Sequence, residues 1–404
     1  MPRALALVCA LVLLPACEQA TDVPTGRQAA VDDIDALRRE GRAALTRLLE
    51  RDAPAELIDA VAQQRDASAS GLYWETELET ALSKARERGV PVLSLRMLGG
   101  LTDEYSCANS RFFRTLLYTD PELSQFLDER FVLHWSTERP VPQVQIDFGD
   151  GRIIHTTTTG NSAHYVLDHA GRVLDVLPGL YDARTFRERL EGVFELHAAT
   201  LRAPDERDAL IAAHHRAAAA ALEGRLATIM TPALRAWMIR PPGQTDDEPV
   251  PALDAQRFTM SKSMVEVPTL RALERAPTFR RDSAEQALRE TLKPAVFSAQ
   301  AIALVRRDRP RRDAESHEDY DARIARLLAA AADNVAMDTA LNEARLHYQI
   351  HQWYIRGEVD GAFASLNERI YTELFATPPA DPWLGLLDDT VYDGLPEVPN
   401  PARG

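Results

Sequence analysis

The chain has 404 residues, of which 45% are hydrophobic and 26% are charged, and its formal net charge is −15. That length and apolar content allow two or three globular domains with real cores, so the chain as a whole is not expected to be disordered. The acidic balance argues against a nucleic-acid partner, because such a partner requires a concentrated basic face.

The first 16 residues predict a signal peptide. Arg3 provides a minimal positive region, Ala4 to Leu14 form an apolar stretch too short to span a bilayer, and the letters LPAC form a small-residue cleavage site that ends at Cys17. The pattern resembles a bacterial lipoprotein signal, which implies cleavage before Cys17 and lipidation of that residue. The Glu18 that follows implies an outer-membrane anchor facing the periplasm. An ordinary secretory signal is the alternative.

The cysteine count then becomes informative. Of the three cysteines, Cys9 leaves with the signal and Cys17 carries the lipid. Cys107 is therefore expected to be the only thiol of an exported chain in an oxidising compartment, so it has no intramolecular disulfide partner.

Residues 17–70 are expected to form a polar tether followed by two helices that break near Asp52 and Pro54. These helices could pack on the next domain or act as a spacer.

Residues 71–200 alternate between helical and strand patterns. The expected helices cover 74–88, 110–117, 121–129 and 185–201, and the expected strands cover 90–97, 131–135, 141–148, 152–159, 163–167 and 172–177. The turn Gly149-Asp150-Gly151 is a strong hairpin signal between the third and fourth strands. This order predicts an α/β domain with a mixed sheet, helices on both of its faces and an extra β-hairpin.

Cys107 follows a strand and a polar loop, and opens the motif Cys-Ala-Asn-Ser at the start of a helix. Free backbone N–H groups and the positive end of the helix dipole stabilise a thiolate at such a position. The position therefore predicts a reactive cysteine.

These residues carry a resemblance to a known fold. The strand GVPVLSL, the loop, the CxxS at a helix start, the run TDPELSQFLDERFV and the hairpin HYVLDHAGRVLDVLPGLYD together resemble a thioredoxin-like domain, closest to the extracytoplasmic and DUF255-like branches. The resemblance covers less than a third of the chain. It implies a thioredoxin-like fold with Cys107 as its reactive residue.

Two departures from that family bear on the chemistry. Ser110 stands where a dithiol motif has its second cysteine, so the chain cannot complete dithiol exchange by itself. The family's cis-proline, which holds a partner strand opposite the cysteine, would fall near Ser162, where a cis bond is costly. The resemblance still implies that Asn161, Ser162 and His164 contact a substrate. Either His164 or the neighbouring Tyr165 could also approach the thiol.

Three interpretations of Cys107 remain open. Its thiolate could attack a disulfide or an oxidised thiol, with Ser110 hydrogen-bonded to the sulfur and an external thiol resolving the adduct. The cysteine could instead be a quiet relic in a fold kept as a binding platform, or it could form an intermolecular disulfide.

Residues 201–404 are expected to form a helical domain with a linker near 240–251. The segment of this domain with the most potential metal ligands is DTALNEARLHYQIH, in which Glu343, His347 and His351 share one helical face. The outer two are about 12 Å apart along a straight helix, too far to bind one ion. A metal site built on a pair such as His347 and His351 would need ligands from elsewhere in the chain, so a hydrogen-bonded interior face is expected instead. The adjacent His214 and His215 are expected to point apart and form no site.

No nucleotide-binding loop, dinucleotide fingerprint, haem attachment, nucleophile elbow or zinc-finger spacing occurs, so no cofactor is expected. The leading hypothesis is monothiol redox or thiol-capture chemistry by Cys107 on an extracytoplasmic protein, which would make the chain an oxidoreductase-like enzyme. The rival hypothesis is a scaffold without catalysis that binds another cell-envelope protein.

Overall fold

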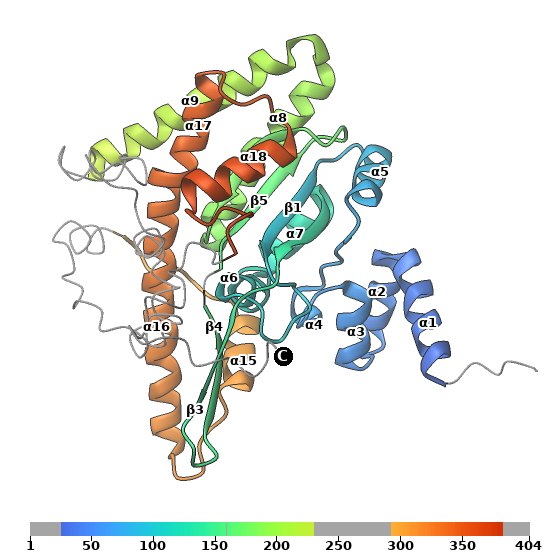
Figure 1. The fold of residues 1–404 in the computed structure, drawn as a ribbon, viewed down its shortest axis with the longest axis vertical. Helices are drawn as coiled ribbons and strands as arrows, with labels where there is room; N and C mark the ends of the chain where they lie inside the picture. Colours follow the sequence, from blue (N-terminus) through green and yellow to red (C-terminus); the bar gives the residue numbers. More distant parts are fainter. Residues whose placement is uncertain (1–25, 159, 230–291, 383–404) are drawn as a thin grey trace, which may run out of the picture.

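The computed structural model describes residues 26–158, 160–229 and 292–382, in which helices surround a small mixed sheet (Figure 1). The expected signal segment, Cys17 and the expected linker near 240–251 lie outside these residues. Among the described residues, no helix is long and apolar enough to cross a membrane.

Four strands form the main sheet in the order β2-β1-β5-β6. Strand β1 (Val92–Leu98) runs parallel to β2 (Val132–Arg139) and antiparallel to β5 (Ser162–Leu167), and β6 (Val173–Pro178) pairs with β5 in antiparallel fashion. Every residue of β5 and β6 is buried, as expected for strands that are covered on both faces. The predicted mixed sheet is confirmed.

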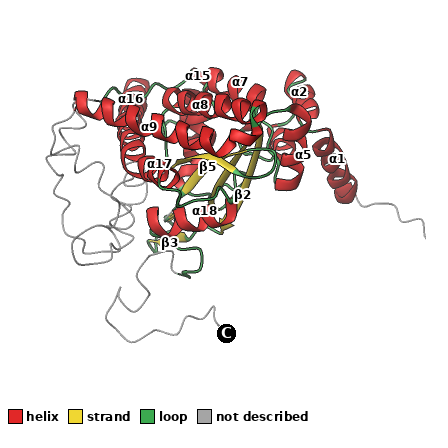
Figure 2. Cartoon of the chain, turned by 90° about the horizontal axis from the view of Figure 1, so that it is seen from above, coloured by secondary structure: helices red, strands yellow, loops and turns green. Residues whose placement is uncertain are grey.

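Helices cover both faces of this sheet. Consecutive strand residues point to opposite faces, and His164 packs on Phe186 of α8 (Ala183–Arg202) while Tyr165 packs on Phe363 of α18 (Phe363–Arg369). Figure 2 shows α8 and α18 on opposite sides of β5.

The remaining helices of the α/β part lie close to their predicted positions. They are α5 (Leu78–Arg88), α6 (Ala108–Phe112) with the π-helical turn η1 (Phe113–Leu117), and α7 (Pro121–Arg130). Asp120 caps α7 because its carboxylate accepts the Leu123 N–H at 2.9 Å.

A long helical run dominates the C-terminal part. Helix α16 (His317–Leu341), the π-helical turn η3 (Asn342–His347) and α17 (Tyr348–Ile355) form one continuous element, vertical in Figure 1. Residues 317–355 are therefore helical without a break, in agreement with the helical part predicted after residue 201. The other elements are the 3-10 turn η2 (Pro204–Glu206), α9 (Arg207–Ile229), α15 (Ala299–Asp308) and the π-helical turn η4 (Ile370–Leu374).

The C-terminal helices pack directly onto the sheet. Ile350 and Trp353 of α17, with Ile370 and Tyr371 of η4, belong to the same buried core as β1, β5 and β6. The sheet and the helices that follow residue 201 are therefore joined by continuous apolar packing.

The N-terminal region contains more helices than the sequence predicts. In place of two, the structure has α1 (Gly26–Glu40), α2 (Arg42–Glu50), α3 (Ala55–Ala62) and α4 (Ala67–Ser70). The additional break between α1 and α2 falls at Gly41, whose φ of 64° is left-handed and ends the first helix. The expected break near Asp52 and Pro54 is confirmed.

Strands β3 (Gln143–Asp147) and β4 (Ile153–Thr157) form the predicted hairpin as a separate two-stranded sheet that projects from the main sheet (Figure 1). Its turn is closed by the Phe148 N–H, which donates to the Arg152 carbonyl at 3.1 Å. Phe148, Ile153 and Ile154 are each about half exposed. We call this ribbon, residues 143–157, the hairpin arm.

Candidate functional site

Cys107 stands where the sequence places it, at the start of a helix after a strand and a loop. It is the N-cap of α6, and its Sγ accepts the backbone N–H of Ser110 at 3.4 Å. One of the helix's free N–H groups is thus directed at the sulfur. The predicted strand-loop-cysteine-helix order is confirmed.

The cysteine is nevertheless fully buried, with 0% of its surface exposed. Its side chain forms a small apolar cluster with Leu98 at the end of β1 and Val141 before the hairpin arm. Gly160 covers it from another side, since a β-carbon added there would lie 2.6 Å from the Cys107 Cβ. A solvent-borne disulfide therefore has no open approach to this sulfur in the folded chain.

Ser110 does not use its hydroxyl as expected. The Ser110 Oγ donates to the Gly100 carbonyl at 3.4 Å, and the contact with the sulfur comes from the backbone N–H. The side chain thus ties α6 to the loop after β1. A hydroxyl committed to a carbonyl does not stabilise a thiolate.

The loop before β5 lies beside the cysteine, as the resemblance implies, but residues of the same chain occupy it. The Asn161 Nδ2 donates to the Thr377 Oγ1 at 2.8 Å, and the Tyr371 hydroxyl donates to the Asn161 carbonyl at 3.2 Å. Ser162 is fully buried, and its Oγ accepts from the Asn109 Nδ2 at 2.7 Å. Asn161 is thus engaged by η4 and by the segment after it, and Ser162 by α6.

His164 lies in an aromatic pocket. Its Nε2 is 2.6 Å from the Tyr118 hydroxyl, and its ring packs edge-on against Phe113 and Phe186. Burial lowers its pKa to about 3, so the ring is neutral at pH 7. These contacts give His164 a structural role in the core, in place of the expected approach to the thiol.

A second group of titratable residues lies between the sheet and the C-terminal helices. Asp175 of β6 is buried, and its two carboxylate oxygens are 2.9 and 3.1 Å from the His347 Nε2. His214 of α9 approaches the same carboxylate at 3.5 Å. Burial lowers the pKa of His347, but the carboxylates of Asp175 and Glu343 overcome this and raise it to about 9. Asp175 and His347 thus form a buried ion pair.

Two further histidines face each other beside this pair. The Nδ1 atoms of His215 and His351 are 2.8 Å apart, and the His215 Nε2 is 3.1 Å from the Leu174 carbonyl. The Tyr354 ring stacks on His215 with 3.9 Å between centroids. Burial lowers the pKa of His215 to about 4 and that of His351 well below its usual value, so both rings are neutral at pH 7.

Glu343 completes this buried group, one helical turn before His347. Arg189 binds its carboxylate through two hydrogen bonds of 2.7 and 2.6 Å, and Arg225 adds a third at 2.7 Å. Glu343, His347 and His351 therefore engage different partners on successive turns. The predicted hydrogen-bonded interior face is therefore present.

The prediction that His214 and His215 point apart is wrong, because their ring centroids are 5.3 Å apart. Both reach the same region of β6, one toward the Asp175 carboxylate and the other toward Leu174 and His351. Asp175, His215 and His351 each offer a ligand atom within 4.8 Å of the others, and all three are buried. The sequence contained one unused signal, a charged residue inside the apolar strand VLDVLP, because a buried Asp requires a partner.

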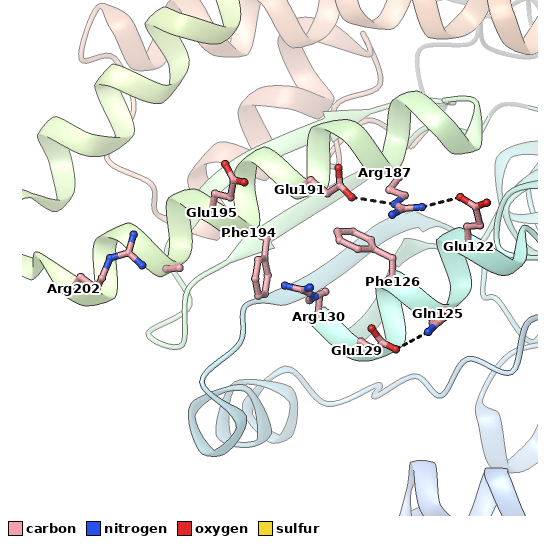
Figure 3. Close-up of a pocket in the computed structure, with 11 residues that line it drawn as sticks. Glu122, Gln125, Phe126, Glu129, Arg130, Arg187, Glu191, Phe194, Glu195 and Arg202 are labelled. Atoms are coloured by element: carbon pink, nitrogen blue, oxygen red, sulfur yellow. Dashed lines mark hydrogen bonds and ion pairs between the residues drawn. The ribbon is translucent and has the colours of Figure 1, made fainter.

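A surface groove of about 780 Å³ lies between α7 and α8 (Figure 3). Its charged side chains pair with one another, as Arg187 does with Glu122 at 2.9 Å and with Glu191 at 3.1 Å. Arg130 lies over the Phe194 ring at 4.9 Å. None of the residues lining the groove belongs to the Cys107 surroundings or to the buried histidine group.

Comparison with known proteins identifies no relative: no protein-family model, no curated protein and no solved structure matches this chain.

Proposed function

We propose that this chain is an exported protein, lipid-anchored through Cys17 in the bacterial cell envelope, whose thioredoxin-like α/β part serves as a scaffold that binds another envelope protein. The observation that carries this choice is the burial of Cys107 beneath Gly160. A platform function does not require access to the thiol, whereas attack on a disulfide does.

The thioredoxin-like assignment is supported by local arrangement. The cysteine caps the helix that follows the central strand β1, and the loop before β5 lies against it. Both relationships are those that the sequence resemblance implies. The long C-terminal run adds helices that the thioredoxin-like part would not contain by itself.

The hairpin arm is the surface on which we place the partner. Ile153 and Ile154 are neighbours on β4, so they point to opposite faces of the ribbon, and both are about half exposed. With Phe148 at the turn, the arm presents apolar side chains on both faces. Its outer strand edges pair with no other strand in the part of the chain that the structure describes. An extended segment of another protein could add a strand there while burying these side chains.

Monothiol chemistry is the second candidate, and one observation favours it. The Ser110 N–H is directed at the Cys107 sulfur, and such donors stabilise a thiolate. In this reaction the thiolate would attack a partner's disulfide, form a mixed disulfide and release one partner sulfur as a thiolate. An external thiol would then attack the adduct and restore Cys107.

Alkylation of Cys107 by iodoacetamide distinguishes the two functions. With Cys17 lipidated, Cys107 is the only cysteine that can react, and a Cys107→Ala variant gives the background. The scaffold predicts slow labelling of the native chain and rapid labelling in urea. Rapid native labelling whose rate has its pH midpoint well below about 8.5 would instead establish the monothiol function.

The anchor has its own test. A Cys17→Ser variant is expected to move from the membrane fraction to the soluble periplasmic fraction, while Cys107→Ser keeps the wild-type distribution. Membrane association that survives the Cys17→Ser change would contradict lipidation at that residue.

A further inference from the structure

We propose that Asp175, His215 and His351 bind one divalent transition-metal ion, with Zn²⁺ as the test ion, and that this ion joins the sheet to the C-terminal helices. Asp175 comes from β6, His215 from α9 and His351 from α17. One nitrogen or oxygen atom of each lies within 4.8 Å of the others, and all three side chains are buried. The inference does not depend on the function of Cys107.

The two facing imidazole nitrogens are the first argument. The His215 Nε2 lies 3.1 Å from the Leu174 carbonyl, which can only accept, so Nε2 carries the proton and Nδ1 presents a lone pair. That lone pair is directed at the His351 Nδ1, 2.8 Å away. Either His351 donates a hydrogen bond there, or both lone pairs bind a common cation.

The surroundings of His215 match those of a metal ligand. A ligating histidine usually donates its second N–H to a carboxylate or a backbone carbonyl, which fixes the ring and the tautomer. The Leu174 carbonyl accepts this hydrogen bond from His215, and the stacked Tyr354 ring fixes the plane of the imidazole. With bonds of about 2.0–2.1 Å, two nitrogens 2.8 Å apart subtend about 90° at the ion. Moving the two nitrogens apart by about half an ångström would bring this angle close to tetrahedral.

The third ligand is an oriented carboxylate. The Asp175 Oδ1 accepts the Val176 N–H at 2.7 Å, and His347 contacts both oxygens. Two imidazoles and one carboxylate form a donor set that suits Zn²⁺ and other first-row divalent ions. His347, which contacts both oxygens of Asp175, is not one of the three ligands.

The burial of all three residues indicates a structural role. A catalytic ion keeps a coordination position open to substrate, whereas these ligands are enclosed between β6, α9 and α17. The bond from β6 to the two helices would span the contact between the α/β part and the helical part. Removing the ion is therefore expected to loosen this contact before it affects the sheet.

The first measurement uses the unmodified full chain, purified without a histidine tag. After dialysis against Zn²⁺ and then against metal-free buffer, elemental analysis is expected to find one zinc per chain. X-ray absorption at the zinc edge is expected to show only nitrogen and oxygen neighbours, including imidazole. Less than stoichiometric zinc, or a sulfur neighbour near 2.3 Å, would overturn the proposal.

The second measurement follows the unfolding of the wild-type chain, so it does not depend on whether any variant folds. Zn²⁺ at 100 times its Kd is expected to raise the unfolding midpoint of the wild-type chain, and a chelator is expected to reverse this. Zinc that binds without any shift in the midpoint would overturn the structural role.

Matched variants then assign the ligands. His215→Gln and His351→Gln are expected to lose the stoichiometric zinc. His317→Gln, which changes an exposed histidine far from the site in sequence, is expected to retain it. Circular dichroism verifies that each variant is folded. Retention of zinc by folded His215→Gln or His351→Gln, or its loss from His317→Gln, would contradict this ligand set.

Discussion

Gly160 lies directly against Cys107, and the space between them has no room for a methyl group. A β-carbon added to Gly160 would be 2.6 Å from the Cys107 Cβ and 3.4 Å from its Sγ. Since neither β-carbon can rotate away, a Gly160→Ala variant must move backbone. We expect it to lose about 1–3 kcal/mol of unfolding free energy, measured by urea denaturation.

The same substitution at a control glycine is expected to change the unfolding free energy in the opposite direction. An added β-carbon at Gly224, within α9, meets nothing within 4 Å, so Gly224→Ala is expected to stabilise the chain by up to about 1 kcal/mol. The loss caused by Gly160→Ala should persist in a Cys107→Ala background, because the clash is with the β-carbon. If Gly160→Ala cost no unfolding free energy in that background, the clash would be with the Cys107 sulfur and not with its β-carbon.

Neutralising the buried carboxylate of Glu343 is expected to be costly. Its side chain is 8% exposed and binds Arg189 and Arg225. Glu343→Gln leaves these guanidinium groups without their counter-charge, and because both are partly exposed, we expect a loss of roughly 2–3 kcal/mol. Glu358→Gln, which removes an exposed carboxylate paired with Arg356 and Arg369, should leave the urea midpoint almost unchanged. Equal effects of the two substitutions would refute the buried pairing.

Buried neutral histidines should make the chain less stable in mild acid. The pKa of His164 is about 3 and that of His134 about 4 in the folded chain, in both cases chiefly because burial disfavours the charged ring. Above pH 6.5 the rings are neutral in both states and contribute no pH dependence. As the pH falls below 6.5, only the unfolded chain takes up their protons, so the folded state loses stability.

A single substitution isolates this effect. Between pH 6.5 and 4.5, His164 alone should account for roughly 2 kcal/mol of the decline in unfolding free energy. His164→Gln retains an acceptor for the Tyr118 hydroxyl and should show a shallower decline over that range, whatever its stability at pH 7. His317→Gln, an exposed control, should keep the wild-type slope. Parallel curves for wild type and His164→Gln would mean that His164 is protonated in the folded chain.

Local patterns were sufficient for the α/β part and for the position of Cys107. An apolar run, a polar loop and a cysteine before helical residues predict a strand, a connection and a helix N-cap, and all are properties of neighbouring residues. The hairpin turn Gly149-Asp150-Gly151 is equally local. The sequence did not predict that this hairpin stands apart from the main sheet, because pairing with that sheet depends on strands distant in the chain.

The burial of Cys107 and the histidine group could not be read from the sequence, because distant segments create both. Gly160 and Val141 enclose the cysteine from separate loops. His215 and His351 are 136 positions apart, yet their Nδ1 atoms are in contact distance. The directions of adjacent helical residues differ by about 100°, which suggested that His214 and His215 could not act together. In the structure, His214 approaches the buried carboxylate of Asp175 on β6, and His215 lies beside it against the Leu174 carbonyl.

The hairpin arm gives the scaffold proposal its most direct test. Because Ile154 is about half exposed on a two-stranded ribbon, Ile154→Lys should change the unfolding free energy by no more than about 0.5 kcal/mol. A photo-crosslinking residue at position 148 is expected to give one discrete protein adduct in the cell envelope, and the Ile154→Lys change should abolish it by placing a charge on the bound surface. The same crosslinker at Leu201, a comparably exposed apolar position on α8, should give no such adduct. If both positions yield the same adduct, or if the adduct survives Ile154→Lys, the arm is not the partner's binding surface, and the scaffold would need a different one.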